Sequence, residues 1–260
     1  MFEEAPAMII KGLLFDFNGT LIDILTNEGE DTPYRITANF LAFHNVKISP
    51  FLLKEEYFRY NKEQRRKSRE EHPEFDVKKI FYEIIYAHTV KEEPEQLASL
   101  PEAAARVFRS AMTYQLKLYE GVRDVLDLLK GQYKMGAVSD GQSLWAQPEM
   151  RACGLEGYFS PVIVSGDYGF RKPDKRLFTI ALEKMGLAPE ETIYIGNDMY
   201  RDVFGAAACG MQTIFFKSNQ GDHSFHGKEP DYIIYDFRQL PEAIRFLESK
   251  PLSPHPEQMT

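Results

Sequence analysis

The chain has only two cysteines, fewer basic than acidic residues, and no long apolar run. Cys153 and Cys209 have no metal-ligand neighbours in the sequence, which excludes a disulfide-built scaffold and fits a reducing compartment. The 31 basic residues against 39 acidic ones give a net charge of −8, which argues against a general binder of nucleic acid or of anionic membranes. No segment has the roughly 20 apolar residues that a membrane span requires, and residues 1–10 open with acids rather than with a signal-peptide pattern. We therefore expect a soluble, cytoplasmic protein.

Strands and helices are predicted to alternate in two parts of the chain. The apolar run at residues 9–17 predicts a buried strand of a parallel sheet. The alternation resumes near residue 119, with helices predicted at 122–130, 142–152, 174–186, 200–209 and 237–248 and strands at 133–138, 161–165, 192–195, 212–216 and 231–235. Alternating strands and helices with short links are typical of an α/β fold with a doubly wound parallel sheet.

The segment between these parts has helical spacing and no strand-like alternation. Its helices are predicted at 34–44, 53–69, 77–88 and 101–118. Residues 1–22 and 119–249 are therefore assigned to an α/β core, residues 23–118 to an inserted helical domain, and the proline-rich residues 250–260 to a flexible tail. The aromatic residues with core spacing, which we expect to pack inside the insertion, are Phe40, Phe43, Phe81, Tyr82 and Tyr86.

Chemistry-bearing residues follow the predicted strand ends. They are Asp16, Asn18, Gly19 and Thr20 after the first strand, Ser139 and Asp140 after the second, Lys172 before a helix, and Asp198 and Asp202 after a later strand. Ligands bind beyond the carboxyl ends of the strands in open α/β sheets, so we expect these side chains to meet. A carboxylate beside a glycine turn that presents N–H groups, with a lysine and further acids, suggests a nucleophile that attacks phosphorus.

The acids at this site predict a divalent cation. Asp198 and Asp202 are four residues apart and face the same way if the turn after Ile195 enters a helix. Together with Asp16 and a phosphate dianion they would repel one another unless a cation lay between them. Mg²⁺, which takes oxygen ligands, is the natural occupant beside a phosphate.

Four motifs in this order and spacing resemble the haloacid dehalogenase superfamily of aspartate-nucleophile phosphohydrolases. They are Leu13-Leu14-Phe15-Asp16-Phe17-Asn18-Gly19-Thr20-Leu21, Gly136-Ala137-Val138-Ser139-Asp140-Gly141, Phe170-Arg171-Lys172-Pro173-Asp174, and the segment from Ile193 to Asp202. The likeness covers roughly residues 9–22 and 119–217. It implies a phosphatase-type member with a Rossmann-like core, a helical cap of the C1 type that closes over the site, and Mg²⁺-dependent hydrolysis of a small phosphorylated metabolite. The linkers near residues 22–24 and 119–121 would then act as hinges.

The resemblance also implies roles for the site residues. Asp16 would accept the phosphoryl group as an aspartyl-phosphate, and Lys172 would pair with Asp16 and with the phosphoryl oxygens. Ser139 would donate a hydrogen bond to the same oxygens. The backbone N–H groups of Gly19, Thr20 and Asp140 would complete the cradle.

The metal ligands implied by the resemblance come from the first and last motifs. They would be the Asp16 carboxylate, the main-chain carbonyl of Asn18, and Asp198, with Asn197 competing for the place of Asp198. Asp202 would either bind the metal through water or orient Lys172.

Asn18 departs from the pattern of that family. Most of its phosphatases carry a second aspartate here, which protonates the leaving oxygen and later deprotonates the attacking water. An amide cannot exchange a proton near neutral pH, and the loss of such help costs about 10²–10⁴-fold in rate. Alkyl phosphates would suffer most, and acyl or aryl phosphates least. Asn18 could be natural in an enzyme with activated substrates or with an acid lent by the cap, a substitution made to trap a complex, or a sign of lost catalysis.

Other activities stay open on the sequence alone. A catalytically silent protein would bind a phosphorylated ligand without turning it over. A phosphomutase would need the acid that is missing at Asn18. A phosphonate hydrolase would need an imine-forming cap lysine, for which the candidates are Lys47, Lys54 and Lys62.

Overall fold

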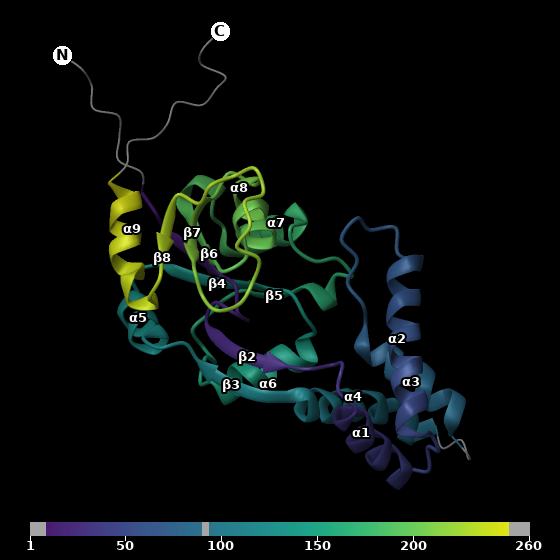
Figure 1. Ribbon diagram of the computed structural model, residues 1–260. Helices are drawn as coiled ribbons and strands as arrows, with labels where there is room; N and C mark the ends of the chain where they lie inside the picture. Colours follow the sequence, from purple (N-terminus) through teal and green to yellow (C-terminus); the bar gives the residue numbers. More distant parts are fainter. Residues whose placement is uncertain (1–8, 90–93, 250–260) are drawn as a thin grey trace, which may run out of the picture.

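A six-stranded parallel sheet lies at the centre of the computed structural model, which describes residues 9–89 and 94–249 (Figure 1). Its strands are β1 (Gly12–Phe15), β4 (Lys134–Ser139), β5 (Val162–Val164), β6 (Thr192–Gly196), β7 (Gln212–Phe216) and β8 (Tyr232–Ile234). They are ordered β5-β4-β1-β6-β7-β8, and every neighbouring pair is parallel. The predicted α/β fold is confirmed.

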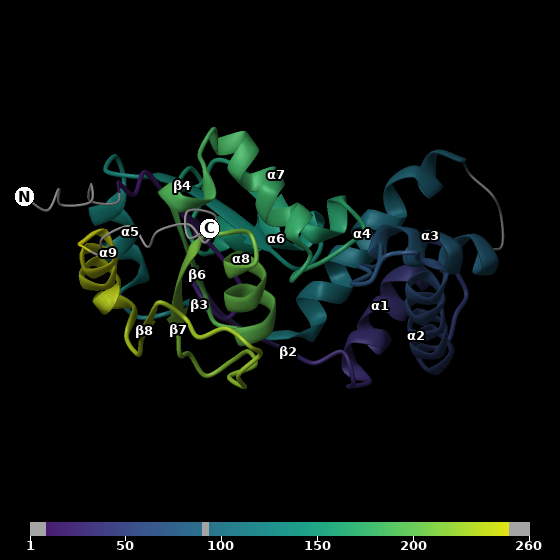
Figure 2. The same ribbon diagram turned by 90° about the horizontal axis from the view of Figure 1, so that it is seen from above.

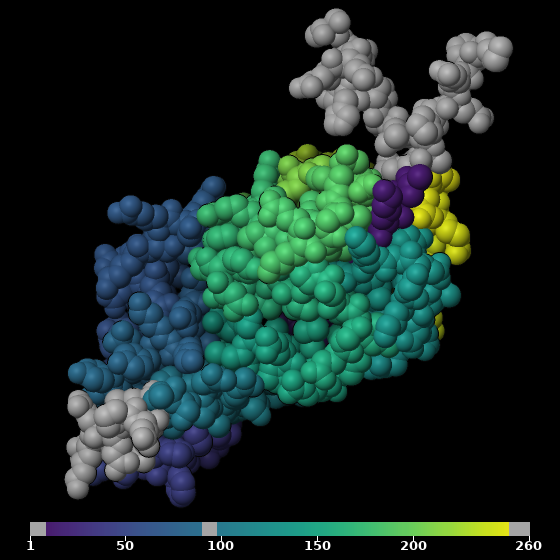
Figure 3. All heavy atoms as spheres, turned by 180° about the vertical axis from the view of Figure 1, so that it is seen from behind, coloured from purple at the N-terminus to yellow at the C-terminus, as the bar shows by residue number. Residues whose placement is uncertain are grey.

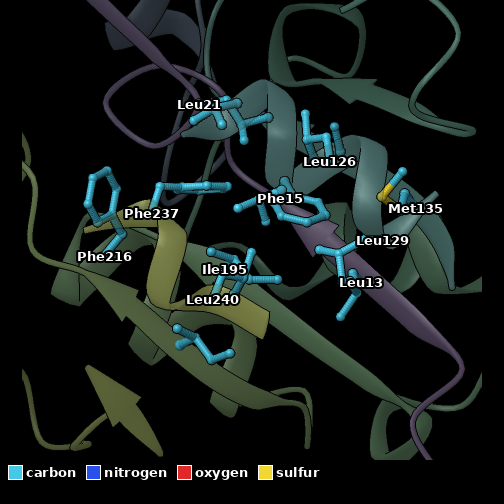
Figure 4. Packing of buried hydrophobic residues seen from close by; sticks show 14 of the residues in the cluster. Leu13, Phe15, Leu21, Leu126, Leu129, Met135, Ile195, Phe216, Phe237 and Leu240 are labelled. Carbon is cyan, nitrogen blue, oxygen red and sulfur yellow. The ribbon is translucent and has the colours of Figure 1, made fainter. Parts of the chain in front are cut away.

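Helices cover both faces of the sheet because successive residues of each strand point to opposite sides. Leu13 and Phe15 of β1 pack toward α5 (Val122–Leu129) and α9 (Leu240–Glu248), as Figure 4 shows for Leu126 and Leu240. The intervening Leu14 packs instead toward α7 (Lys175–Met185) and α8 (Gly205–Ala207). All of these apolar residues are buried, so the packed sheet supports the residues that follow the ends of its strands.

The order of the strands fixes where a ligand can bind. From β1 the chain crosses to β4 on one side, and from β6 it crosses to β7 on the other. The crevice of a doubly wound sheet opens at such a reversal, beyond the carboxyl ends of the two strands. Here it lies between the segment after Phe15 and the segment after Gly196.

Four helices form a separate helical unit, seen beside the sheet in Figure 2. They are α1 (Thr32–Phe43), α2 (Pro50–Lys67), α3 (Val77–His88) and α4 (Pro94–Met112). The side chains of Ser49 and Asp76 cap α2 and α3 by accepting hydrogen bonds from first-turn N–H groups, as the sequence favours at these positions. The helices enclose their own apolar cluster, which includes Tyr57, Phe81 and Phe108.

The prediction that all five aromatic residues pack inside this unit is wrong for three of them. Phe81 is buried, and Phe40 packs partly against the cluster. Phe43, Tyr82 and Tyr86 have exposed fractions of 84%, 44% and 56%. The two tyrosines lie four residues apart on the outer side of α3 and stack on each other, with ring centroids 6.2 Å apart.

A two-stranded ribbon connects the helical unit to the sheet, where the sequence predicted a linker and the end of a helix. β2 (Ile22–Thr26) pairs antiparallel with β3 (Thr113–Leu118), and the register shifts between Leu25 and Thr26. The predicted helix 101–118 is therefore wrong beyond Met112. Leu116 and Leu118 pack against the cluster below the sheet, so pairing and burial outweigh the helical spacing. The predicted boundaries at 22/23 and 118/119 fall within this ribbon and stay a prediction, and the predicted tail 250–260 lies outside the described residues.

A second attachment comes from α6 (Ser143–Ala152), a helix of the core. The indole of Trp145 is buried in the apolar cluster of the helical unit, and its N–H donates to the carbonyl of Ala105 at 3.0 Å. The side chains of Arg109 and Glu149 form an ion pair at 2.5 Å beside it. Within the described residues, no helix is both long and apolar enough to cross a membrane.

Candidate active site

The predicted nucleophile and lysine meet in the crevice between β1 and β6. The Lys172 ammonium lies 2.7 Å from Asp16 Oδ1 and 2.6 Å from Asp202 Oδ1. It also donates to the carbonyl of Val138, the residue before Ser139, at 3.2 Å. All three charged side chains are almost fully buried. Asp202 therefore orients Lys172, which is one of the two roles that the sequence left open.

Tyr194 is a fourth member of this buried group that sequence reasoning missed. Its hydroxyl lies 3.1 Å from both Lys172 Nζ and Asp202 Oδ1. Its hydrogen bond with Lys172 shows that the Tyr194 side chain lies on the same side of the sheet as that lysine. The alternation of strand residues is the only pattern that could have indicated it.

Burial and charge act against each other on these groups. Burial raises the pKa of Asp16 to about 6, because the desolvation of its carboxylate and the repulsion by Asp202 outweigh the attraction of Lys172. Burial alone would lower the pKa of Lys172, but Asp16 and Asp202 outweigh it and hold that pKa well above its usual value. Lys172 is therefore a fixed cation, and the group carries one excess negative charge when both acids are ionised.

The turn after Asp16 presents different N–H groups from those that the sequence predicted. The N–H of Gly19 donates to the Ile22 carbonyl at 2.8 Å, and that of Thr20 donates to the Phe17 carbonyl at 3.2 Å. Both are thus used within the turn. Within the described residues, the N–H groups of Phe17 and Asn18 have no acceptor, so these two are free to meet an anion.

The second strand end contributes its predicted residues. Ser139 is buried directly after Val138, and its hydroxyl has only a long 3.4 Å contact with the Asp140 carbonyl. The Asp140 carboxylate accepts the Lys172 backbone N–H at 2.9 Å, and it lies 3.7 Å from the guanidinium of Arg201. The Asp140 N–H has no acceptor in the described part of the chain, as the phosphate prediction requires.

The last motif turns Asn197, rather than Asp198, toward the nucleophile. The Thr20 hydroxyl lies 3.0 Å from both Asp16 Oδ2 and Asn197 Oδ1. Asp198 instead caps the π-helix Met199–Phe204, and its carboxylate accepts from the N–H groups of Tyr200, Arg201 and Asp222.

Arg201 holds the Asp198 carboxylate away from the nucleophile. Its Nη2 lies 2.7 Å from Asp198 Oδ2, and burial, which would raise the pKa of Asp198, is outweighed by this pairing, so the pKa lies below its usual value. The prediction that Asp198 is a metal ligand therefore has no support in the side-chain geometry. Asn197 was named from the sequence only as a competitor of Asp198, and Arg201 was missed, although its position between two acids could have indicated it.

The oxygens around Thr20 fit a hard divalent cation. The hydroxyl of Thr20 has one proton, so it can donate to only one of the two oxygens that lie 3.0 Å from it. One carboxylate oxygen of Asp16 and the amide oxygen of Asn197 thus lie close together at the two strand ends, and the main-chain carbonyl of Asn18 is the third oxygen ligand that the resemblance implies. Mg²⁺ is commonly held by one or two carboxylates with water and substrate phosphate completing its shell. No group of three or more His, Cys, Asp or Glu side chains suited to a metal occurs within residues 9–89 and 94–249.

The Asn18 side chain is half-buried beside this oxygen set. Within the described residues its amide has no hydrogen-bond partner. It is therefore available to a bound ligand, but as a fixed donor and acceptor rather than as an acid.

Comparison with known proteins identifies the class that this fold and site define. The haloacid dehalogenase-like hydrolase family matches residues 10–210, and the chain belongs to that family. Several of the relatives that match the chain carry the names of phosphatases.

Two such relatives are named glyceraldehyde 3-phosphate phosphatase. The one from Methanothermobacter thermautotrophicus is 31% identical over 124 residues, which cover 46% of this chain and 55% of the relative. The one from Methanopyrus kandleri is 26% identical over 246 residues, which cover 92% of this chain and 99% of the relative. The chain thus spans only about half the length of the relative from Methanothermobacter thermautotrophicus.

The fold has solved counterparts. A 2-haloacid dehalogenase from Pseudomonas syringae matches with a TM-score of 0.67 at 20% sequence identity, over 92% of this chain and 99% of that one. At this identity the match shows the shared fold, including the arrangement of helices beside the sheet, and says nothing of the substrate.

Proposed function

We propose that the protein is a Mg²⁺-dependent phosphatase that acts on a small phosphorylated metabolite through an aspartyl-phosphate on Asp16. The observation that carries the proposal is the Asp16 carboxylate, held at 2.7 Å by a buried lysine and bordered by free N–H groups of Phe17, Asn18 and Asp140. A carboxylate nucleophile needs this environment, because the transferring phosphoryl oxygens bring negative charge toward it. The names of the relatives support the same chemistry.

Each residue of the site then has a task. Lys172 neutralises the phosphoryl oxygens, and Asp202 and Tyr194 keep its ammonium in place. Asp16, Asn197 and the Asn18 carbonyl would hold Mg²⁺, which supplies charge neutralisation between the nucleophile and the phosphate when bound. Thr20 orients Asp16 and Asn197, and the helical unit α1–α4 acts as the cap over the crevice.

Asn18 narrows the class of substrate. Since its amide cannot protonate a leaving group, substrates whose leaving group is a weak base should be favoured. These are acyl and aryl phosphates rather than alkyl phosphates such as the one in the relatives' name. We therefore infer a preference for an activated phosphate.

Phosphate release from a panel of esters tests the proposal. Acetyl phosphate, p-nitrophenyl phosphate and glyceraldehyde 3-phosphate are incubated with the purified chain, with Mg²⁺ or with EDTA, and the Asp16→Asn variant is the control. We expect Mg²⁺-dependent release that is fastest with acetyl phosphate and absent in the variant. Equal release by the Asp16→Asn variant would remove Asp16 as the nucleophile.

A second candidate is a protein that binds a phosphorylated ligand without turning it over, and the unpartnered amide of Asn18 favours it. This candidate predicts phosphate binding with no release from any ester. A phosphonate hydrolase is less well supported at Lys54, because its ammonium is held at 2.6 Å by both Asp31 and the Gly29 carbonyl and cannot readily form an imine.

A further inference from the structure

The loop between α2 and α3, residues 68–76, lies against the core directly before Lys172; we term it the docking loop. The N–H of Glu74 donates to the Gly169 carbonyl at 3.0 Å, and the N–H of Arg171 donates to the His72 carbonyl at 2.9 Å. Pro73 and Phe170 form the antiparallel bridge between these two bonds. Figure 3 shows the blue residues of the helical unit directly against the green residues of the core on this side of the molecule.

Glu74 of the docking loop reaches further, to the second strand end. Its Oε2 accepts a hydrogen bond from the Ser165 hydroxyl at 2.8 Å. The same hydroxyl oxygen accepts the backbone N–H of Gly141 at 2.9 Å. A continuous hydrogen-bonded chain thus runs from Gly141 through Ser165 to a carboxylate of the helical unit.

The Gly141 end of this chain adjoins the anion site. The free N–H of Asp140 belongs to the preceding peptide, and the Asp140 carboxylate holds the backbone of Lys172 at 2.9 Å. The space around Gly141 is tight, because a Cβ at the neighbouring Gly166 would lie 2.6 Å from the Gly141 carbonyl oxygen. The Gly141 carbonyl, which belongs to the following peptide, accepts the N–H of Gly166 at 2.8 Å. Ser165 and Gly166 therefore hold the two peptide groups on either side of the Gly141 Cα.

Glu74 is buried more deeply than a surface contact requires. Its side chain is 4% exposed, and the nearest cation, Arg65 Nη2, is 3.7 Å away. A carboxylate in such a position is costly unless hydrogen bonds satisfy it, and those bonds come from the Phe75 N–H at 3.0 Å and from Ser165. A second hydrogen bond beside it, which Gln142 Nε2 donates to the Phe75 carbonyl at 2.6 Å, also joins the docking loop to the segment after β4.

We propose that Glu74 is a positioning residue that, through the Ser165 hydroxyl, fixes the 140–141 peptide, and with it the adjacent peptide that carries the Asp140 N–H of the anion site, while the docking loop is seated. The inference rests on the proposed function, since it takes the Asp140 N–H as part of a phosphate cradle. It makes the affinity for phosphate depend on a contact supplied by the helical unit. Glu74 itself touches no reacting atom.

Calorimetric titration with inorganic phosphate in the presence of Mg²⁺ tests the proposal without any need for turnover. The variants are Glu74→Ala, Ser165→Ala, the double variant, and Glu74→Gln, which keeps an oxygen acceptor at the same length. The matched control is Glu70→Ala, because Glu70 lies in the same docking loop and pairs with Arg176 of the core at the surface, away from Ser165. Melting temperatures of all variants show whether each is folded at the temperature of titration.

We expect Glu74→Ala and Ser165→Ala each to raise the Kd for inorganic phosphate about tenfold, as the loss of one hydrogen bond at a charged group does. The double variant should bind phosphate no more weakly than the weaker single variant, because both substitutions interrupt the same series of hydrogen bonds. Glu74→Gln should restore most of the affinity, and Glu70→Ala should bind as the unchanged protein does. Should Glu74→Ala fail to fold, Ser165→Ala removes the same bond from the core side.

A Kd for phosphate that is unchanged in folded Ser165→Ala, or effects that add in the double variant, would overturn the inference. The proposed function is judged separately, by ester hydrolysis in the unchanged protein. If the unchanged protein hydrolyses esters but the variants leave the Kd for phosphate unchanged, only the positioning role of Glu74 is rejected. A protein that neither hydrolyses esters nor binds inorganic phosphate would reject the proposed function and the inference with it.

Discussion

At the scale of single residues, the meeting of Asp16, Lys172 and Asp202 could be predicted from the sequence, but the choice between Asn197 and Asp198 could not. The motif gives both residues oxygen atoms at adjacent positions. Which of them faces Asp16 depends on the backbone after Gly196, where Asp198 takes the capping position of a π-helix and pairs with Arg201. Chain conformation at a turn decides this, and spacing does not encode it.

Asn18→Asp should raise the turnover of alkyl phosphates at least about tenfold, because it supplies a general acid. The gain should be smaller for acetyl phosphate, whose leaving group needs no proton. Steady-state rates of the two pure proteins on both substrates provide the measurement. An equal gain on both substrates would point to a change in metal binding rather than to proton transfer.

The raised pKa of Asp16 predicts how its replacement affects stability in the absence of metal. A folded-state pKa of about 6 lies above the ordinary value of 3.8, so Asp16 stabilises the fold when protonated, and this contribution is lost as the pH rises through 6. Asp16→Asn cannot ionise. In EDTA, the melting temperature of Asp16→Asn should therefore rise relative to that of the unchanged protein as the pH increases from 5 to 8.

Asp198→Asn is the matched control for that experiment. The pKa of Asp198 is lowered, so its stabilising contribution is fully present above its ordinary pKa and is lost only in stronger acid. The difference between Asp198→Asn and the unchanged protein should stay constant from pH 5 to pH 8. A constant difference for Asp16→Asn as well would contradict the assigned pKa.

At the scale of elements, the sequence predicted most helices and strands of the core but not the strand β3. The residues Thr113–Leu118 were read as the end of the helix predicted at 101–118, and their partner β2 is far away in the chain. The free energy that decides between helix and strand here comes from pairing and from burial against the core, which no local window contains. The helix predicted at 200–209 is present, but it begins as the π-helix Met199–Phe204 and continues as α8.

The turn after Asp16 depends on a glycine whose replacement can be tested. Gly19 has φ +89°, and a Cβ there would lie 2.3 Å from Asn197 Nδ2. Gly19→Ala should lower both the melting temperature and the affinity for Mg²⁺, because Asn197 must move. Gly131→Ala is the control, since Gly131 has φ +84° with nothing within 4 Å of the added atom.

Titration with Mg²⁺ and thermal unfolding separate the two effects. The control should lose about 1–2 kcal/mol of stability from the backbone conformation alone and should bind Mg²⁺ as before. Equal Mg²⁺ affinity in Gly19→Ala would show that Asn197 does not contribute to the metal site.

At the scale of the whole molecule, one side chain ties the helical unit to the core. Trp145 belongs to a core helix, yet it is 6% exposed within the cluster of the helical unit. Trp145→Ala should destabilise the protein by about 3–5 kcal/mol, as is usual for a buried tryptophan. The helical unit should also become more sensitive to proteolysis than the core. Trp145→Phe, which keeps most of the apolar contact, is the matched control for the indole hydrogen bond.

The docking loop and α6 form one continuous contact between the helical unit and the core, because the rings of Phe75 and Trp145 lie 6.4 Å apart and Gln142 Nε2 donates to the Phe75 carbonyl at 2.6 Å. The ribbon of β2 and β3 carries both chain crossings (Figure 1). We expect a movement of the helical unit to bend this ribbon at the register shift between Leu25 and Thr26. Such a movement would break the contacts of α6 and of the docking loop together, so we expect a substrate to enter beside the docking loop and the segment before Lys172.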